Sequence, residues 1–330
     1  FDEKDINLEN FTAVVVFSDM KRIGYFACGN DLVQQLYENI VWGLRGNFLD
    51  VPTDCPQRDE RLGWTGDAQV FARTASTTYR TDKFFRKWLH DLAADQRENG
   101  AFTDVCPELQ GWESHGSSAW ADAGIIVPYQ VYAAYGDKTI IEEQFESMKK
   151  WIAFMESKGT EKGLFDAHDH HFGDWLSLDA GYEATGGLTD KNLIGSAYLA
   201  YSNSLLIKMG KAIGKDMSYY EDLYEHSIKA YRKKFLNTGK TEHETQTANV
   251  LALHFNLTDN RAREAEKLVK DIEACGHLKT GFVGTPYLLH TLTEIGRADL
   301  AYKLLLRKEF PSWLLPVTKG ATTMWERWDG

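Results

Sequence analysis

Apolar residues recur at helical spacing along most of the chain after Gly29. In the first such stretch one face carries Val33, Leu36, Tyr37, Ile40, Val41 and Leu44, and Asn30 or Asp31 can cap its start. The same spacing predicts further helices over 67–80, 82–98, 118–135, 138–158, 189–213, 216–236, 244–254, 259–275, 285–295 and 297–307. Residues that commonly end helices separate many of them, namely Gly136, Gly159, Gly214, Asn237, Gly276 and Gly296.

The chain before Gly29 has a different pattern. Residues 12–18 are rich in β-branched and aromatic side chains and predict a strand, and residues 23–28 predict a second. We therefore expect a short β segment ahead of a helical body that begins at residue 29.

About eleven helices with almost no strand between them fit either a solenoid of helix pairs or a closed double ring. A solenoid should show a fixed sequence period, and none is present. Long links at 47–65, 99–117, 159–188 and 308–325 alternate with short ones. This alternation favours an α/α barrel with its long loops on one rim, where long ordered loops are usually functional.

The first long loop has the most unusual composition. Residues 50–67 contain five carboxylates, two arginines and Trp64, and two prolines and two glycines interrupt the backbone. No helical or strand period fits this mixture. A solvated surface loop is the plain alternative, but Trp64 and the Gly-Trp-Thr-Gly turn are poor choices for one. The composition indicates metal binding, sugar binding or acid–base chemistry.

The amino-acid composition narrows the classes of molecule that the protein could bind. A net charge of -11 argues against nucleic acid or an anionic membrane, and no apolar run approaches a membrane span. Ten Trp, 15 Tyr and 17 Phe beside many acids fit a carbohydrate partner, whose apolar faces stack on aromatic rings. The four cysteines form neither a zinc pattern nor a disulfide framework. The compartment and the oligomeric state, a homodimer included, stay open.

Glycoside hydrolysis needs two carboxylates on either side of the scissile bond. Glu60 in the first long loop and Glu326 after the last are the candidates, and only a closed fold could bring them together. The alternative is a metal, held by the His168–His171 cluster or, for Ca²⁺, by the acidic loop. The cluster lacks the usual helical H-E-x-x-H spacing, so we predict no metal and no cofactor.

Three segments resemble one family. DCPQRDERLGWTGD at residues 54–67 resembles the signature of bacterial α-L-rhamnosidases, glycoside hydrolase family 78. MWERWD at 324–329 resembles that family's second catalytic segment, and FGDW at 172–175 resembles its middle-loop motif. The resemblance implies an all-α (α/α)₆ barrel at 29–330, with residues 1–28 as the end of a preceding β-sandwich domain. It also implies that the barrel lacks its last helix, because the chain stops soon after the second segment.

The resemblance also implies the chemistry, an inverting hydrolase that releases terminal α-L-rhamnose. Glu60 would be the general acid and Glu326 the general base. The polar substrate-binding residues would be Asp54, Arg58 and Asp67, and the sugar pocket would be lined by Trp64, Trp120 and Trp175. Another exo-glycosidase, a polysaccharide lyase and a non-catalytic carbohydrate-binding protein are the alternatives. The aglycone is not predicted.

Overall fold

The computed structural model describes residues 7–109, 114–166 and 170–329, and nearly all regular secondary structure in this part of the chain is helical. The first six helices are α1 (Asp31–Asn47), α2 (Thr65–Thr78), α3 (Asp82–Ala94), α4 (Ala123–Tyr135), α5 (Thr139–Ser157) and α6 (Lys191–Ala212). The others are α7 (Ser218–Phe235), α8 (Gln246–His254), α9 (Arg261–Cys275), α10 (Thr285–Glu294), α11 (Ala298–Leu305) and α12 (Leu314–Thr318). Single 3₁₀ turns lie at Leu8–Asn10 and Thr241–His243.

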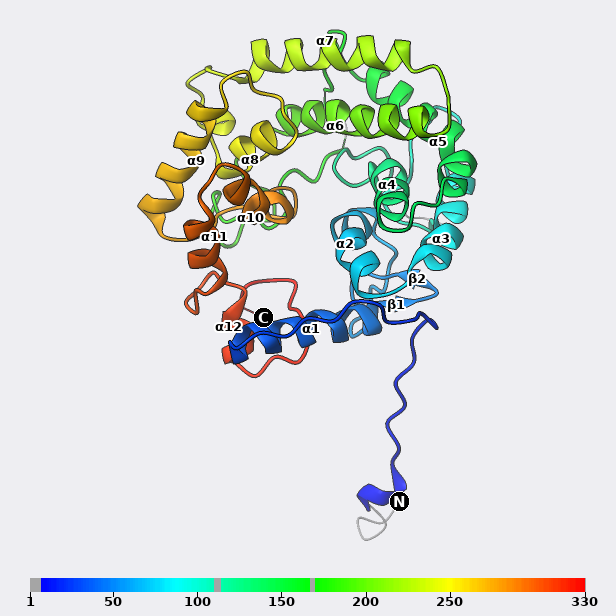
Figure 1. Ribbon diagram of the computed structural model, residues 1–330, viewed down its shortest axis with the longest axis vertical. Coiled ribbons are helices and arrows are strands. Elements are labelled where there is room, and N and C mark those ends of the chain that lie inside the picture. Colours follow the sequence, from blue (N-terminus) through cyan, green and yellow to red (C-terminus); the bar gives the residue numbers. More distant parts are fainter. Residues whose placement is uncertain (1–6, 110–113, 167–169, 330) are drawn as a thin grey trace.

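The helices form two concentric rings (Figure 1). The inner ring runs through α2, α4, α6, α8 and α10, and each of these helices packs against the next. The outer ring consists of α3, α5, α7, α9 and α11, while α1 and α12 lie beside each other between α11 and α2. The predicted α/α barrel is therefore confirmed.

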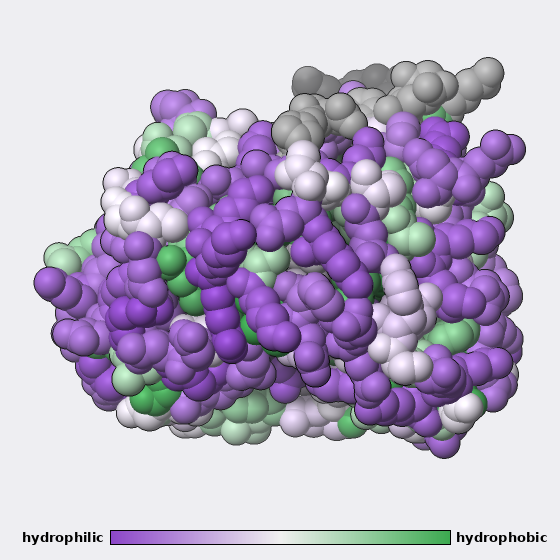
Figure 2. Space-filling view, turned by 90° about the horizontal axis from the view of Figure 1, so that it is seen from above, coloured by the Kyte–Doolittle hydropathy of each residue, from purple (hydrophilic) through white to green (hydrophobic). Residues whose placement is uncertain are grey.

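Burial explains which helices lie inside. Inner helices have neighbours on several sides, and Ala123–Pro128 of α4 are all buried. Outer helices bury one face only, as α3 does through Phe84, Trp88 and Leu92. The outer surface seen from the α7 side is accordingly mostly hydrophilic (Figure 2). Among the described residues, no helix is long and apolar enough to cross a membrane.

The predicted strands at 12–18 and 23–28 do not form. Residues 12–16 are exposed and have no strand beside them, and they belong to an extended arm that leaves the barrel (Figure 1). High β propensity does not make a strand without a partner for its backbone groups. The arm joins the barrel further along, where Ile23 and Gly24 donate backbone hydrogen bonds to Thr78.

Three smaller features also differ from the prediction. The fourth helix begins at Ala123 rather than near 118, because residues 118–122 fold into turns. The described chain has one regular sheet, an antiparallel hairpin of β1 (Phe48–Leu49) and β2 (Val51–Pro52). The hairpin and the five-residue α12, which falls in the predicted long loop 308–325, are too short to leave a periodic pattern.

Each inner helix is entered through a link on the same rim of the barrel. The links before α2, α4, α6, α8 and α10 span 48–64, 95–122, 158–190, 236–245 and 276–284. The first three are long, as the sequence predicted. The segment after α12 also lies at this rim, so side chains from both ends of the chain can lie close together there.

Close packing between the rim and the inner ring provides a stability test. A Cβ on Gly195 of α6 would lie 2.1 Å from the buried ring of Phe165. We expect Gly195→Ala to lower the free energy of unfolding by about 1–3 kcal/mol, as overpacking does. In Gly43→Ala of α1 the new methyl group meets nothing closer than 3.8 Å. This control should be neutral or slightly stabilising in urea denaturation, and equal effects of the two substitutions would contradict the packing described.

Candidate active site

All eight residues predicted for the site line one cavity of about 420 Å³ on the loop rim. The full lining is Asp54, Arg58, Glu60, Trp64, Asp67, Trp120, Phe172, Trp175, Phe282 and Glu326. Four interhelical links, the first turn of α2 and the segment after α12 contribute to it. The fold therefore brings together the carboxylates from opposite ends of the chain.

Arg58 lies at the centre of the polar half of this pocket. One terminal nitrogen is 2.8 Å from Glu60 Oε2 and 3.4 Å from Asp54 Oδ2, and the other is 3.2 Å from Glu326 Oε2. Its Nε donates to Cys55 Sγ at 3.1 Å. The hydrogen bond to Cys55 and the charges of Glu326 and Glu60 raise the pKa of Arg58, so the guanidinium stays charged. One cation thus holds both candidate catalytic carboxylates.

The acidic loop has a defined conformation because polar contacts fix it. Asp54 Oδ1 accepts from the Leu62 amide at 2.8 Å, and the Asp54 amide donates to the Leu62 carbonyl. Gly63 lies against the next long loop, where a Cβ would be 2.0 Å from the Cys106 carbonyl oxygen. These contacts explain the glycine at this position and the alignment of the two loops.

Glu60 is held at both of its oxygens. Trp64 Nε1 donates to Glu60 Oε1 at 2.8 Å, while Arg58 binds Oε2. The Glu60 and Glu326 side chains are 32% and 44% exposed to solvent, so a ligand entering the pocket can reach both. Their accessibility is what acid–base chemistry on a bound molecule requires.

Asp67 differs electrostatically from its neighbours. Burial, followed by the charges of Asp54 and Glu326, raises the pKa of Asp67 to about 8. At neutral pH this carboxyl group therefore carries a proton and can donate a hydrogen bond to an oxygen of a ligand. The pocket thus offers a neutral carboxyl donor beside the carboxyl groups that contact Arg58.

Aromatic rings form the other half of the pocket. Phe172 packs against Trp64 and Trp120, with ring centroids 5.4 and 4.8 Å apart. Phe282 lies nearly parallel to Trp120 at 6.2 Å, and Trp175 meets Phe172 edge-on at 6.1 Å. The sequence prediction missed Phe172 and Phe282 as site residues. Phe172 stands inside a recognised motif, whereas Phe282 lies in a short link with no distinguishing pattern.

The metal alternative can be tested against the donor set. Asp54, Cys55 and Glu60 place possible ligand atoms within 4.8 Å of one another. The Arg58 guanidinium binds all three side chains and so provides the positive charge there. In the predicted histidine cluster, His168 and Asp169 lie outside the described residues. His170 lies edge-on to Phe172, whereas His171 is buried and accepts from the Gly173 amide, so these two do not converge.

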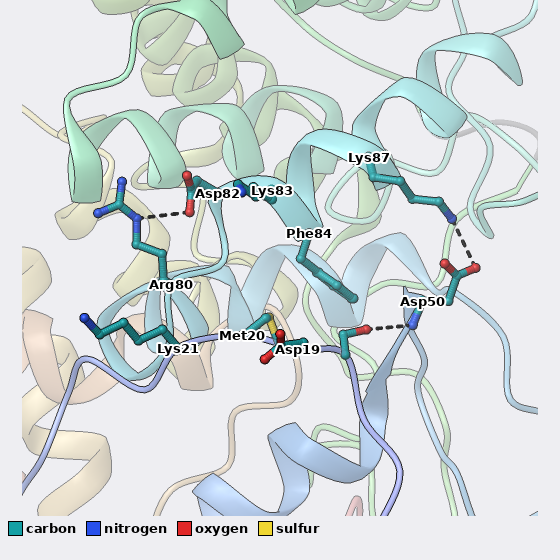
Figure 3. A pocket seen from close by; sticks show the side chains of 10 residues that line it. Asp19, Met20, Lys21, Asp50, Arg80, Asp82, Lys83, Phe84 and Lys87 are labelled. Carbon is teal, nitrogen blue, oxygen red and sulfur yellow. Dashed lines mark hydrogen bonds and ion pairs between the residues drawn. The ribbon is translucent and has the colours of Figure 1, made fainter.

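A second, larger cavity of about 820 Å³ lies between the N-terminal arm and α3. Figure 3 shows that Arg80 there pairs with Asp82, and Lys87 with Asp50. Its lining contains one aromatic residue, Phe84, and does not include either predicted catalytic carboxylate. The aromatic pocket around Arg58 is therefore the better candidate active site.

A ring of helix hairpins with a carboxylate and aromatic pocket on its loop rim places the protein in the class of six-hairpin glycosidase-type barrels. Residues 21–330 match the family described as bacterial alpha-L-rhamnosidase 6 hairpin glycosidase domain. The chain belongs to this family, as the sequence motifs indicated.

Individual relatives agree with this family assignment. An alpha-L-rhamnosidase from Streptomyces avermitilis is 45% identical over 302 residues, which cover 90% of this chain and 28% of that protein. The crystal structure of the S. avermitilis enzyme complexed with L-rhamnose matches 95% of this chain and 30% of its own, with 42% identity and a TM-score of 0.89. A native Aspergillus terreus α-L-rhamnosidase structure matches 96% and 38%, with 39% identity and a TM-score of 0.88. The chain thus spans about a third of the length of these relatives.

The raised pKa of Asp67 predicts a pH dependence of stability. Between pH 4 and pH 8 the folded state keeps a proton that the unfolded chain, with an ordinary pKa of 3.8, has released. The free energy of unfolding should therefore fall as pH rises through this range. Asp67→Asn removes the cost, so it should stabilise the chain more at pH 8 than at pH 5.

Urea denaturation at the two pH values measures this difference. Asp259→Asn, on the exposed link before α9, is the control and should change stability equally at both. An Asp67→Asn effect that is the same at pH 5 and pH 8 would show that Asp67 is ionised throughout.

Proposed function

We propose that this chain is the catalytic domain of an α-L-rhamnosidase that releases terminal α-L-rhamnose with inversion of the anomeric centre. The observation that carries the proposal is the pair of carboxylates, Glu60 and Glu326, held on one guanidinium at an aromatic pocket. Family membership and the L-rhamnose complex of the S. avermitilis relative support the substrate.

In this proposal Glu60 is the general acid and Glu326 the general base. Glu60 donates a proton to the glycosidic oxygen as the bond to the leaving group breaks. Glu326 removes a proton from a water molecule that attacks the anomeric carbon from the opposite face. Inversion needs space for that water between the sugar and Glu326. In the structure the Arg58 guanidinium contacts Glu60 and Glu326 through different nitrogens. When substrate and water bind, these two side chains would exchange contacts with Arg58 for contacts with substrate and water.

The remaining pocket residues bind the sugar. Asp54 and Arg58 present a carboxyl group and a charged donor to hydroxyl groups, and Asp67 adds a neutral carboxyl group. The apolar wall of the pocket, against which the sugar would lie, is formed by Trp64, Trp120, Trp175, Phe172 and Phe282. An apolar wall suits rhamnose, because its C6 is a methyl group and transferring that group from water to an apolar surface is favourable.

We also interpret residues 1–28 as the end of a preceding β-domain. The described arm exposes Val14, Val15 and Val16, and residues 12–16 have no strand partner among the residues described. Exposed β-branched side chains on an extended backbone favour pairing with a sheet contributed by another part of the protein.

Leaving groups of different acidity distinguish the two carboxylates. Glu60→Gln should reduce turnover of an unactivated alkyl α-L-rhamnoside by roughly 10²–10⁴-fold, because that leaving group needs a proton. It should affect a p-nitrophenyl α-L-rhamnoside much less, because p-nitrophenolate leaves without protonation. Glu326→Gln should slow both substrates, and added azide, which needs no base, should partly restore turnover.

The kcat values for both substrates measure these effects. Glu266→Gln, on the exposed side of α9, is the control and should leave both unchanged. If Glu60→Gln slowed the two substrates equally, or if azide rescued it instead of Glu326→Gln, the assigned roles would be wrong.

A further inference from the structure

Asp174 is fully buried between two rim loops, one residue before Trp175 of the pocket. Oδ1 accepts from the Val283 amide at 2.8 Å and more weakly from the Gly284 amide at 3.3 Å. Oδ2 accepts from the Gly281 amide at 2.9 Å and from the Thr247 hydroxyl on α8. The carboxylate therefore ties the 158–190 loop to the 276–284 link and to an inner helix.

The backbone around Asp174 extends this connection. The Phe282 amide donates to the Trp175 carbonyl at 2.9 Å. Further along the same loop, the Leu178 amide and the Ser177 hydroxyl both donate to the Lys279 carbonyl, at 2.9 and 2.7 Å. The approach is so close that a Cβ on Gly281 would lie 2.2 Å from the Trp175 carbonyl oxygen. The two segments thus hold each other, and each carries one aromatic wall of the pocket.

An ionised carboxylate suits this arrangement, because three backbone amides point at its oxygens. The Asp174 carboxylate accepts from the Thr247 hydroxyl and from backbone amides, so both of its oxygens face donors. Burial raises the pKa of Asp174 to about 6, while the bonds from Thr247, Gly281 and Val283 oppose that rise. The group is therefore largely ionised at neutral pH, with its charge shared among oriented amides.

We propose that Asp174 is a positioning residue for the pocket, because it fixes the distance between Trp175 and Phe282 at which both can contact the bound sugar. The inference rests on the proposed function for its catalytic readout. Asp174 is not among the residues that line the pocket, so it acts through the two aromatic residues that do. Its loss should weaken sugar binding more than it slows the chemical step.

The principal variant is Asp174→Asn, which turns one acceptor into a donor facing other donors. We expect KM for p-nitrophenyl α-L-rhamnoside to rise about tenfold with kcat changed by less than about threefold. Thr247→Val removes a single donor and should change KM in the same direction by a smaller factor. It also carries the test if Asp174→Asn does not fold.

Asp166→Asn is the matched control. Asp166 is also buried in the 158–190 loop, where it accepts from Thr160 and pairs with Lys234, away from the pocket. Its substitution should lower stability and leave KM unchanged. A merely structural role of Asp174 would give the same result for both aspartates.

Hydrogen exchange provides a readout that does not depend on turnover. In ligand-free protein, Asp174→Asn should speed amide exchange about tenfold or more in peptides covering 278–286, and Asp166→Asn should not. Unchanged exchange there, or an unchanged KM in an active Asp174→Asn, would overturn the positioning role. Absence of rhamnoside hydrolysis by the unmodified chain, with the exchange effect present, would instead contradict the proposed function alone.

Discussion

Buried carboxylates that accept loop amides are the interaction on which the rest of this structure depends. A double ring of helices is rigid, but its pocket is built almost wholly from the links between helices. Asp104, Asp122 and Asp174 are each fully buried, and each accepts a backbone amide from the loop that it orders. A buried charge is costly unless hydrogen bonds satisfy it, so each such group strongly favours one loop conformation.

These three aspartates act at different parts of the rim. Asp104 accepts from the Ser117 amide. Asp122 accepts from the Ala119 amide beside Trp120 and from the indole of Trp151, and Asp174 fixes the approach of the Trp175 and Phe282 loops. The aromatic half of the pocket is thus held in place by buried carboxyl groups behind it, while the polar half is held by the cation Arg58 within it. Acceptors and donors on the ligand side remain available for a sugar.

The helical architecture could be predicted from sequence because each hairpin repeats a strong physical pattern. Outer helices such as α3 bury one face, so helical periodicity reveals them, whereas α4 is apolar nearly all round and its start at Ala123 left no such signal. The predicted N-terminal strands are absent because a strand depends on a partner and not on local pattern alone. Propensity at residues 12–18 is local, whereas a strand needs a neighbouring strand, which the described chain does not supply beside residues 12–16.

The site was predictable only where its chemistry is concentrated in the sequence. Glu60 and Trp64 lie in one unusual loop, and Glu326 in a short aromatic and acidic segment. The joint contact of Arg58 with both glutamates depends on how distant loops meet, and no spacing encodes it. Phe282 was missed because a single aromatic residue in a short link resembles ordinary core, and only its contact with Trp120 reveals its place.

The most direct measurement of the central claim is the anomeric form of the first sugar released. Proton NMR can follow this chain acting on an aryl α-L-rhamnoside before the anomers equilibrate. If Glu326 activates water opposite the group protonated by Glu60, β-L-rhamnose appears first and the α anomer grows in later. Initial release of α-L-rhamnose would mean a double displacement, and it would contradict the roles assigned to the two carboxylates.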